Sequence, residues 1–187
     1  GMGGTSTDLG LRLDIFRRDR SARAGEMRRL ASGWADTVTV SRPSGGAHSV
    51  ARLLAMAYPD RLARARGGAG QFLLANGRAG QVDADDLLAR APWCVVAEMT
   101  GTAAAARILA AAPVSEAEVL AIAGQRITSG EELTFDPQAM ALRARRVRRL
   151  DAITLESQTM PVPKNDAAAL ALALGIASVG VHRLPWS

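Results

Sequence analysis

The spacing of apolar residues changes at Pro59, and this change constrains the fold more than any other feature of the sequence. Before Pro59, apolar residues recur every three or four positions, which is the period of an amphipathic helix. After Pro59, short apolar runs are separated by turn-forming residues, which is typical of strands and hairpins. A helical segment followed by several short strands predicts an α+β fold.

Three short helices are predicted within residues 1–58. The first follows the N-cap candidate Asp8, and the other two cover residues 27–38 and 50–57. Residues 41–46 contain Ser, Gly and Pro, and they predict a turn-forming linker between the second and third helices. Each helix carries one narrow apolar stripe, so it needs another surface to pack against. We therefore interpret residues 1–58 as part of a larger helical bundle.

A hairpin is predicted soon after Pro59. The pair Asn76-Gly77 accepts positive φ at both centres of a two-residue turn, so residues 71–82 are expected to form two antiparallel strands. Residues 93–99 and 107–111 are expected to form a second antiparallel pair.

The same segment, residues 59–124, ends in a helix with clear termini. Ser115 and Glu118 have the spacing of a capping box, and Gly124 closes the helix. Five short strands and a small helix suit an open barrel of the OB type, which is a scaffold that binds nucleic acids or oligosaccharides.

Residues 125–187 are expected to add strands and a C-terminal helix packed on the barrel. The arginine-rich segment 142–149 fits either a helix or a strand. We favour a strand with a bulge before Arg146, because residues 153–155 continue it. Asn165 is the expected N-cap of the final helix.

Composition excludes several kinds of chemistry. The only lysine, Lys164, does not follow a glycine-rich turn, so the chain has no P-loop for nucleoside triphosphates. The single cysteine, Cys94, permits no internal disulfide and, with two histidines, gives too few ligands for a metal site. We expect no catalytic site and no cofactor in this chain.

The sequence shows neither a membrane span nor a secretion signal. No apolar run reaches the roughly 18 residues that a membrane helix requires, and no basic flank precedes an apolar stretch at the N-terminus. A lone cysteine favours a reducing compartment, so a cytoplasmic location is expected. The three tryptophans lie in apolar stripes and are expected in the core; they are Trp34, Trp93 and Trp186.

Arginines form clusters, and the formal net charge is +5. Guanidinium groups bind phosphates in two-point contacts, which a polyanion site requires. For the clusters in residues 17–29 and 143–149, solvated surface charge or protection of a sheet edge is an equally good explanation. The third cluster surrounds the predicted first hairpin and contains Arg61, Arg64, Arg66 and Arg78. These four and Arg107, on a later predicted strand, are our candidate nucleic-acid ligands.

Several motifs follow one another through residues 48–187. They are Tyr58-Pro59-Asp60-Arg61, Phe72-Leu73-Leu74-Ala75-Asn76-Gly77-Arg78, Val95-Val96-Ala97-Glu98, Arg107-Ile108-Leu109-Ala110-Ala111-Ala112-Pro113, Leu142-Arg143-Ala144-Arg145-Arg146 and Leu184-Pro185-Trp186-Ser187. In this order they resemble the C-terminal region of the HrpB type of DEAH-box ATP-dependent RNA helicase. The likeness is weaker over the first 40 residues.

This resemblance implies two RecA-like ATPase lobes in the whole protein, and it places ATP and Mg²⁺ in those lobes rather than in this chain. It also implies that the first helices complete a ratchet-like bundle. An OB-like domain would then form one side of a channel for single-stranded RNA.

The predicted function is a noncatalytic accessory region that binds single-stranded RNA or DNA through arginines. Few aromatic residues are available for base stacking, so we expect weak, salt-sensitive and sequence-tolerant binding. The alternative is a docking module that packs on the ATPase lobes or on a partner protein and makes no contact with nucleic acid.

Overall fold

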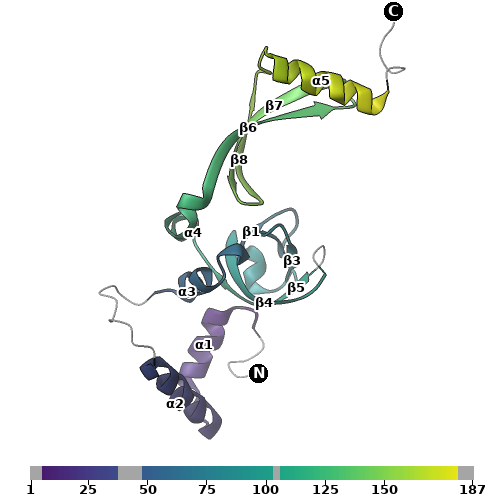
Figure 1. Ribbon diagram of the computed structural model, residues 1–187. Coiled ribbons are helices and arrows are strands. Elements are labelled where there is room, and N and C mark those ends of the chain that lie inside the picture. The colour runs from purple at the N-terminus through teal and green to yellow at the C-terminus, as the bar shows by residue number, and fades with distance from the viewer. Residues whose placement is uncertain (1–5, 38–47, 103–105, 181–187) are drawn as a thin grey trace, which may run out of the picture. The chain divides into compact units, whose positions relative to one another are not determined.

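The computed structural model describes residues 6–37, 48–102 and 106–180, and it confirms the predicted α+β fold class. The chain divides into two compact units, Gly1–Gly124 and Gln125–Ser187 (Figure 1). The helices of the first unit are α1 (Leu9–Arg18), α2 (Ala22–Thr37), α3 (Val50–Ala57) and α4 (Glu116–Ala123). Its strands are β1 (Leu62–Ala65), β2 (Gln71–Leu74), β3 (Ala79–Gln81), β4 (Trp93–Gly101) and β5 (Ala106–Pro113).

The strands of the first unit form a closed barrel in the order β1-β2-β3-β5-β4. Neighbouring strands are antiparallel except β3 and β5, which run parallel. The barrel closes where Leu62, Ala63 and Arg64 of β1 pair with β4. The expectation of an open barrel is therefore wrong, although the five predicted strands are present. Pairing between strands far apart in the chain leaves no local signal in the sequence.

The predicted first hairpin is present, but its loop is one residue longer than expected. Leu73 of β2 pairs with Ala79 of β3, and the amide of Gly77 donates to the carbonyl of Leu74 at 2.9 Å. Gly77 has φ 84°, whereas Asn76 is not among the residues with positive φ. A three-residue loop that ends in a left-handed glycine is a common hairpin connection. The predicted two-residue turn at Asn76-Gly77 is thus wrong.

The barrel interior is filled by apolar side chains. Phe72, Leu74 and Cys94 are completely buried, and Ile108 is 2% exposed. A Cβ on Gly80 would lie 3.0 Å from Cδ1 of Ile108, so the glycine leaves space for that side chain. Burial raises the pKa of the Cys94 thiol to about 12.

Helices α1 and α3 begin close to the predicted residues, whereas α2 begins at Ala22 rather than at residue 27. Asp8 caps α1, since its Oδ1 accepts from the amide of Gly10 at 2.7 Å. The amide of Ala111 in β5 donates to the carbonyl of Thr7 at 2.9 Å, which attaches the start of α1 to the barrel. Arg28 of α2 donates to the carbonyl of Phe16 in α1 at 3.0 Å. The predicted linker 41–46 and Val38 lie outside the described residues.

The described tryptophans differ in how far their side chains are exposed to solvent. Trp93 is 2% exposed, as expected of a core residue, whereas Trp34 on α2 is 68% exposed. The prediction that Trp34 packs in the core is wrong, because α1 lies beside the apolar stripe of α2 but leaves an open groove there, which Trp34 lines. Trp186 lies outside the described residues.

Helix α4 is capped as predicted and is connected to α3. The hydroxyl of Ser115 and the carboxylate of Glu118 form a capping box. The hydroxyl of Ser49, the N-cap of α3, donates to Oε1 of Glu118 at 2.9 Å. Hydrogen bonds from Ser49 and then from Ser115 lower the pKa of the Glu118 carboxyl.

The second unit contains an antiparallel sheet in the order β6-β7-β8 and one helix. Its elements are β6 (Ile127–Asp136), β7 (Ala141–Leu150), β8 (Ile153–Met160) and α5 (Asp166–Val179). Helix α5, capped by Asn165, lies against β6 and β7, and a Cβ on Gly175 would collide with the ring of Phe135. None of the helices in the described residues has both the length and the apolarity of a membrane span.

The arginine-rich segment is a strand, as predicted, but its details differ. β7 is the central strand of the sheet, so protection of a sheet edge does not explain its charge. The bulge lies between Arg148 and Arg149 rather than before Arg146. Residues 153–155 do not continue this strand but belong to β8, after a turn at Asp151 with φ 50°.

Most arginines of β7 face a carboxylate. The ion pairs are Arg143–Asp136, Arg146–Glu131, Arg148–Glu156 and Arg149–Glu132, at 2.5, 3.3, 2.9 and 2.8 Å. Backbone amides of Ala139 and Gln138, with the Arg143 guanidinium, lower the pKa of Asp136. This cluster is therefore largely neutralised by the sheet itself, which supports the interpretation of surface charge.

Candidate nucleic-acid interface

One outward row of polar side chains crosses four neighbouring barrel segments. The amide of Arg66, just after β1, donates to the carbonyl of Gln71 at 2.9 Å. Gln71 of β2 pairs with Gln81 of β3, and Gln81 pairs with Arg107 of β5. We call Arg66, Gln71, Gln81 and Arg107 the polar row. With neighbouring strands 4.7–4.9 Å apart, the backbone of the row spans roughly 14 Å.

Side chains alternate between the two faces of each strand, and those of the polar row lie on the face that points away from the core. All four side chains are exposed, whereas their neighbours Phe72, Gly80 and Ala106 are buried. The next outward row consists of Arg64, Leu73 and Ala79. No aromatic side chain belongs to either row, so this face offers hydrogen bonds and charge rather than a stacking platform.

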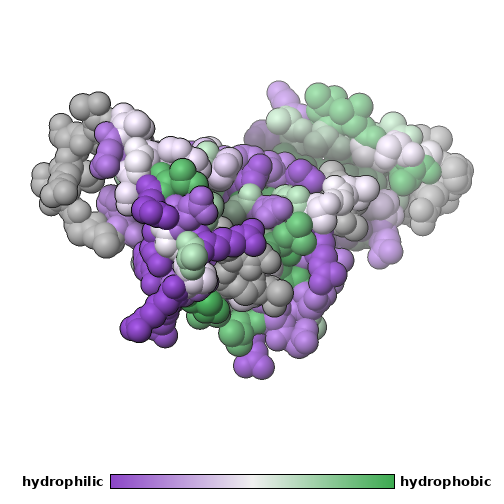
Figure 2. Space-filling model, turned by 90° about the horizontal axis from the view of Figure 1, so that it is seen from below, coloured by the Kyte–Doolittle hydropathy of each residue, from purple (hydrophilic) through white to green (hydrophobic). Residues whose placement is uncertain are grey.

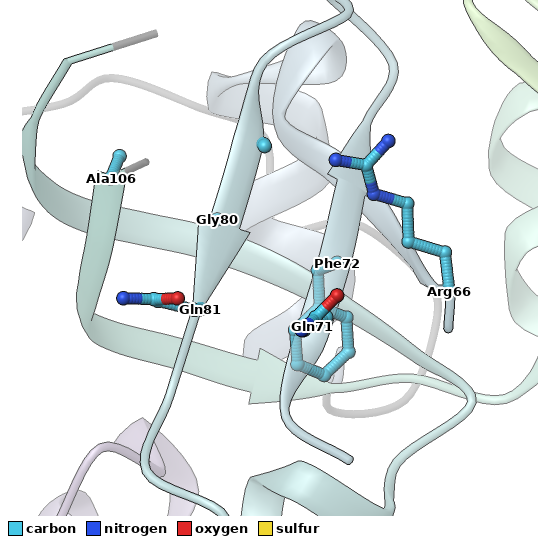
Figure 3. A pocket seen from close by; sticks show the side chains of 7 residues that line it. Arg66, Gln71, Phe72, Gly80, Gln81 and Ala106 are labelled. Atoms are coloured by element: carbon cyan, nitrogen blue, oxygen red, sulfur yellow. The ribbon is translucent and has the colours of Figure 1, made fainter. Parts of the chain in front are cut away.

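Two adjacent hollows lie along the polar row. The first has a volume of about 180 Å³ and is lined by Arg66, Gln71, Phe72, Ala79, Gly80, Gln81 and Ala106. The second has a volume of about 280 Å³, and its lining includes Asp83 and Arg107. Both are lined by Gln71 and Gln81, so the two glutamines separate them. Figure 3 shows Arg66 and Gln71 on one side of Gly80 and Gln81 beside Ala106.

The two arginines of the row differ in their partners. Nη2 of Arg107 donates to Oδ2 of Asp83 at 2.6 Å, and both side chains are more than half exposed. Arg66 forms no ion pair with any residue that the structure describes. An exposed pair such as Arg107–Asp83 contributes only about 0–1 kcal/mol to stability, so an anionic ligand can compete with Asp83 for this guanidinium.

The other candidate arginines are held against the barrel. Nη1 of Arg61 donates to the carbonyl of Ala97 at 2.7 Å, and its guanidinium carbon lies 4.4 Å from the centroid of the Tyr58 ring. The guanidinium carbon of Arg64 lies 5.6 Å from the centroid of the Trp93 ring. These cation–π contacts give both side chains a structural role in the free protein.

Arg78 lies beside the hairpin loop, at the opposite end of β2 and β3 from the polar row. Its Nη2 donates to the carbonyl of Gly101 at 3.5 Å, and its Nε is buried without a hydrogen-bond partner. Of the five candidates, the structure therefore places Arg66 and Arg107 in one exposed row, at its two ends. The nucleic-acid role of all five stays a prediction.

Reasoning from the sequence did not single out Gln71 and Gln81. Polar residues at exposed strand positions are common, and neither residue carries a charge. The predicted two-residue turn at Asn76-Gly77 would place Gln71 opposite Val82, whereas the longer loop of the structure sets the register that places Gln71 opposite Gln81.

Within the described residues, no three His, Cys, Asp or Glu side chains are grouped as metal ligands would be. Asp86 instead caps a short 3₁₀ turn, since its Oδ1 accepts from the amide of Leu88 at 2.8 Å. The hydroxyl of Thr7 also donates to Asp86.

Comparison with known proteins confirms the resemblance predicted from the sequence. No family model matches the chain. The ATP-dependent RNA helicase HrpB of Escherichia coli (strain K12) is 32% identical over 140 residues, which cover 74% of this chain and 17% of the relative.

Two solved structures match nearly the whole chain. The crystal structure of the E. coli DExH-box NTPase HrpB has a TM-score of 0.64 and 28% identity, and it matches 98% of this chain. The crystal structure of the Escherichia coli DEAH/RHA helicase HrpB has a TM-score of 0.62 and 26% identity over the same share. The chain spans 22% of the length of each solved protein and 17% of the curated relative.

Proposed function

Since the chain is homologous to the C-terminal region of HrpB-type helicases, we propose that it is an accessory region of an ATP-dependent RNA helicase. In this proposal, ATP and Mg²⁺ bind to the ATPase lobes of the whole protein. The accessory region contributes a surface for single-stranded RNA or DNA, which is the polar row and its two hollows. A cytoplasmic location stays a prediction.

The observation that carries this proposal is the position of Arg66. Its guanidinium is exposed, has no acidic partner among the described residues, and lines a hollow that two amide side chains also line. A guanidinium binds a phosphate through two parallel hydrogen bonds. Arg107 at the far end of the row supplies a second cation for the next part of the same backbone.

The proposal also predicts the character of binding. Contacts to phosphate carry no sequence information, and the face lacks aromatic side chains for stacking. The affinity of the chain by itself is therefore weak and depends on counterion release.

The test is titration of a fluorescently labelled single-stranded RNA with this chain at low salt. Arg66→Gln is expected to weaken binding about ten-fold, which corresponds to about 1.4 kcal/mol for a lost charge-assisted contact. Arg29→Gln is the matched control, because it removes another exposed positive charge, from α2 rather than from the barrel. No binding by the unmodified chain, or equal loss in both variants, would contradict the proposal.

A docking function is the second candidate, and an apolar groove between α1 and α2 favours it. The groove has a volume of about 270 Å³ and is lined by Leu9, Arg12, Leu13, Phe16, Met27, Ala31 and Trp34. Figure 2, seen from the side of these helices, shows apolar surface between hydrophilic side chains. Such a groove fits packing on another part of a helicase. In the whole protein, Trp34→Ser would then alter ATPase activity while the RNA affinity of this chain is retained.

A further inference from the structure

We propose that Gln71 and Gln81 bind the hydrogen-bonding edge of one unstacked nucleobase, adenine by preference, while Arg66 binds its phosphate. This inference rests on the proposed function and extends it, because a surface that contacts only phosphates is indifferent to the bases. It predicts that the polar row distinguishes a nucleotide from a bare sugar-phosphate unit.

The first step is the availability of the two amides. Neither side chain makes a hydrogen bond with any residue that the structure describes, and both are exposed on the same outward row. Each amide offers two N–H donors and one carbonyl acceptor. Two such groups on adjacent strands present alternating donors and acceptors across the boundary between the hollows.

The second step is the loop between β1 and β2, which keeps the Gln71 amide accessible. A Cβ on Gly67 would lie 3.4 Å from Oε1 of Gln71, and a Cβ on Gly68 would lie 3.7 Å from its Nε2. Side chains at these two positions would extend over the amide. The pair of glycines therefore leaves the Gln71 amide open beside Arg66.

The third step is the match between these groups and possible ligands. Phosphate oxygens only accept hydrogen bonds, so they cannot pair with the carbonyl oxygens of the two amides, which are also acceptors. A nucleobase edge carries donors and acceptors side by side, and glutamine, like asparagine, can form two hydrogen bonds with adenine. Single-stranded nucleic acid exposes such edges without a cost of opening a duplex.

The fourth step is the size and lining of the hollow beside Arg66. The hollow lined by Arg66, Gln71 and Gln81 has a volume of about 180 Å³, and its lining includes no exposed aromatic ring. A base in this hollow is held by its edge rather than by stacking. Because Arg66 lies next to Gln71 in the row, one nucleotide can place its phosphate and its base on adjacent residues.

The test compares oligomers of equal length and charge. A ten-unit oligo(dA), a ten-unit oligo(dT) and a ten-unit abasic deoxyribose-phosphate oligomer are titrated with the unmodified chain and with Gln71→Ala, Gln81→Ala and the double variant. The unmodified chain is expected to bind oligo(dA) at least about five-fold more tightly than the abasic oligomer, which is the low end of discrimination by a two-bond contact. The double variant is expected to bind the two oligomers equally.

Gln158→Ala is the matched control, because it removes an exposed glutamine from strand β8 of the second unit. It is expected to keep the preference for oligo(dA). Thermal unfolding of each variant establishes that the barrel is folded under the conditions of the titration.

The outcomes separate this inference from the proposed function. If all three oligomers bind equally and Arg66→Gln weakens the binding of each, the proposed phosphate binding is supported and base recognition is overturned. A preference for oligo(dA) that survives in the double variant, or a preference for oligo(dT), overturns the assignment of adenine to these glutamines. If no oligomer binds at low salt, both proposals fail.

Discussion

Two glycines of the loop between β1 and β2, Gly67 and Gly70, have positive φ. Gly70 has φ 77°, a conformation that L side chains rarely adopt, and its carbonyl accepts from the amide of Val82 at 2.9 Å. A Cβ on Gly70 would lie 2.6 Å from the carbonyl oxygen of Val82. This glycine therefore allows the β1–β2 loop to approach the end of β3, where the hollows lie.

Substitution of Gly70 tests this role. Gly70→Ala is expected to lower the free energy of unfolding by about 1–3 kcal/mol, because it combines left-handed backbone strain with a steric collision. Gly33→Ala in α2 is the control, since nothing lies within 4 Å of a Cβ there. It is expected to raise stability slightly through helix propensity. Urea unfolding measures both, and an unchanged midpoint for Gly70→Ala would contradict the structural role.

Single residues also show what the sequence could not reveal about the candidate site. Arginines attract attention because of their charge, and five were predicted as ligands. Arg61 is held by a cation–π contact with the nearby Tyr58, and Arg64 by one with Trp93, which is far away in the sequence and which no local pattern indicates. Gln71 and Gln81 are uncharged, and only the register of the hairpin makes them neighbours.

Secondary-structure elements were predictable where their signals are local. Caps at Asp8, Ser115 and Asn165 and the hairpin around Gly77 depend on residues a few positions apart, and the structure has each of them. Closure of the barrel and the central place of β7 depend on pairing between distant strands. Such pairing is set by the whole chain rather than by a motif, so these features were missed.

The contact between α3 and α4 gives a prediction for pH dependence. Hydrogen bonds from Ser49 and Ser115 lower the pKa of Glu118 below its ordinary value of 4.5. A carboxyl whose pKa is lower in the folded protein stabilises the fold at pH above 4.5, and this contribution is lost as the pH falls through that value and then through the folded pKa.

Thermal unfolding of the unmodified chain and of Glu118→Gln between pH 6 and pH 3 tests this contact. The unmodified chain is expected to be the more stable at pH 6, and the difference is expected to shrink toward pH 3 as its carboxyl becomes protonated. Glu116→Gln, an exposed acid in the same first turn, is the control. A difference between the unmodified chain and Glu118→Gln that is constant with pH would contradict the contact.

The molecule as a whole combines a helical segment, a closed barrel and a separate sheet in a chain that is homologous to one region of a helicase. Its positive charge is not one continuous surface. The arginines of β7 are paired with carboxylates, and two of the barrel arginines lie over aromatic rings. On the barrel, the polar row combines an exposed arginine without an acidic partner among the described residues, Arg66, with two exposed amide side chains.

The salt dependence of RNA affinity decides whether this surface binds the phosphate backbone. Two phosphate contacts, to Arg66 and Arg107, predict a slope of about −1.4 in a plot of log association constant against log salt concentration, since single strands contribute about −0.7 per contact. The predicted slope of Arg66→Gln is about −0.7, and that of Arg29→Gln equals the slope of the unmodified chain. A slope near zero, or one that Arg66→Gln leaves unchanged, would contradict binding at the polar row.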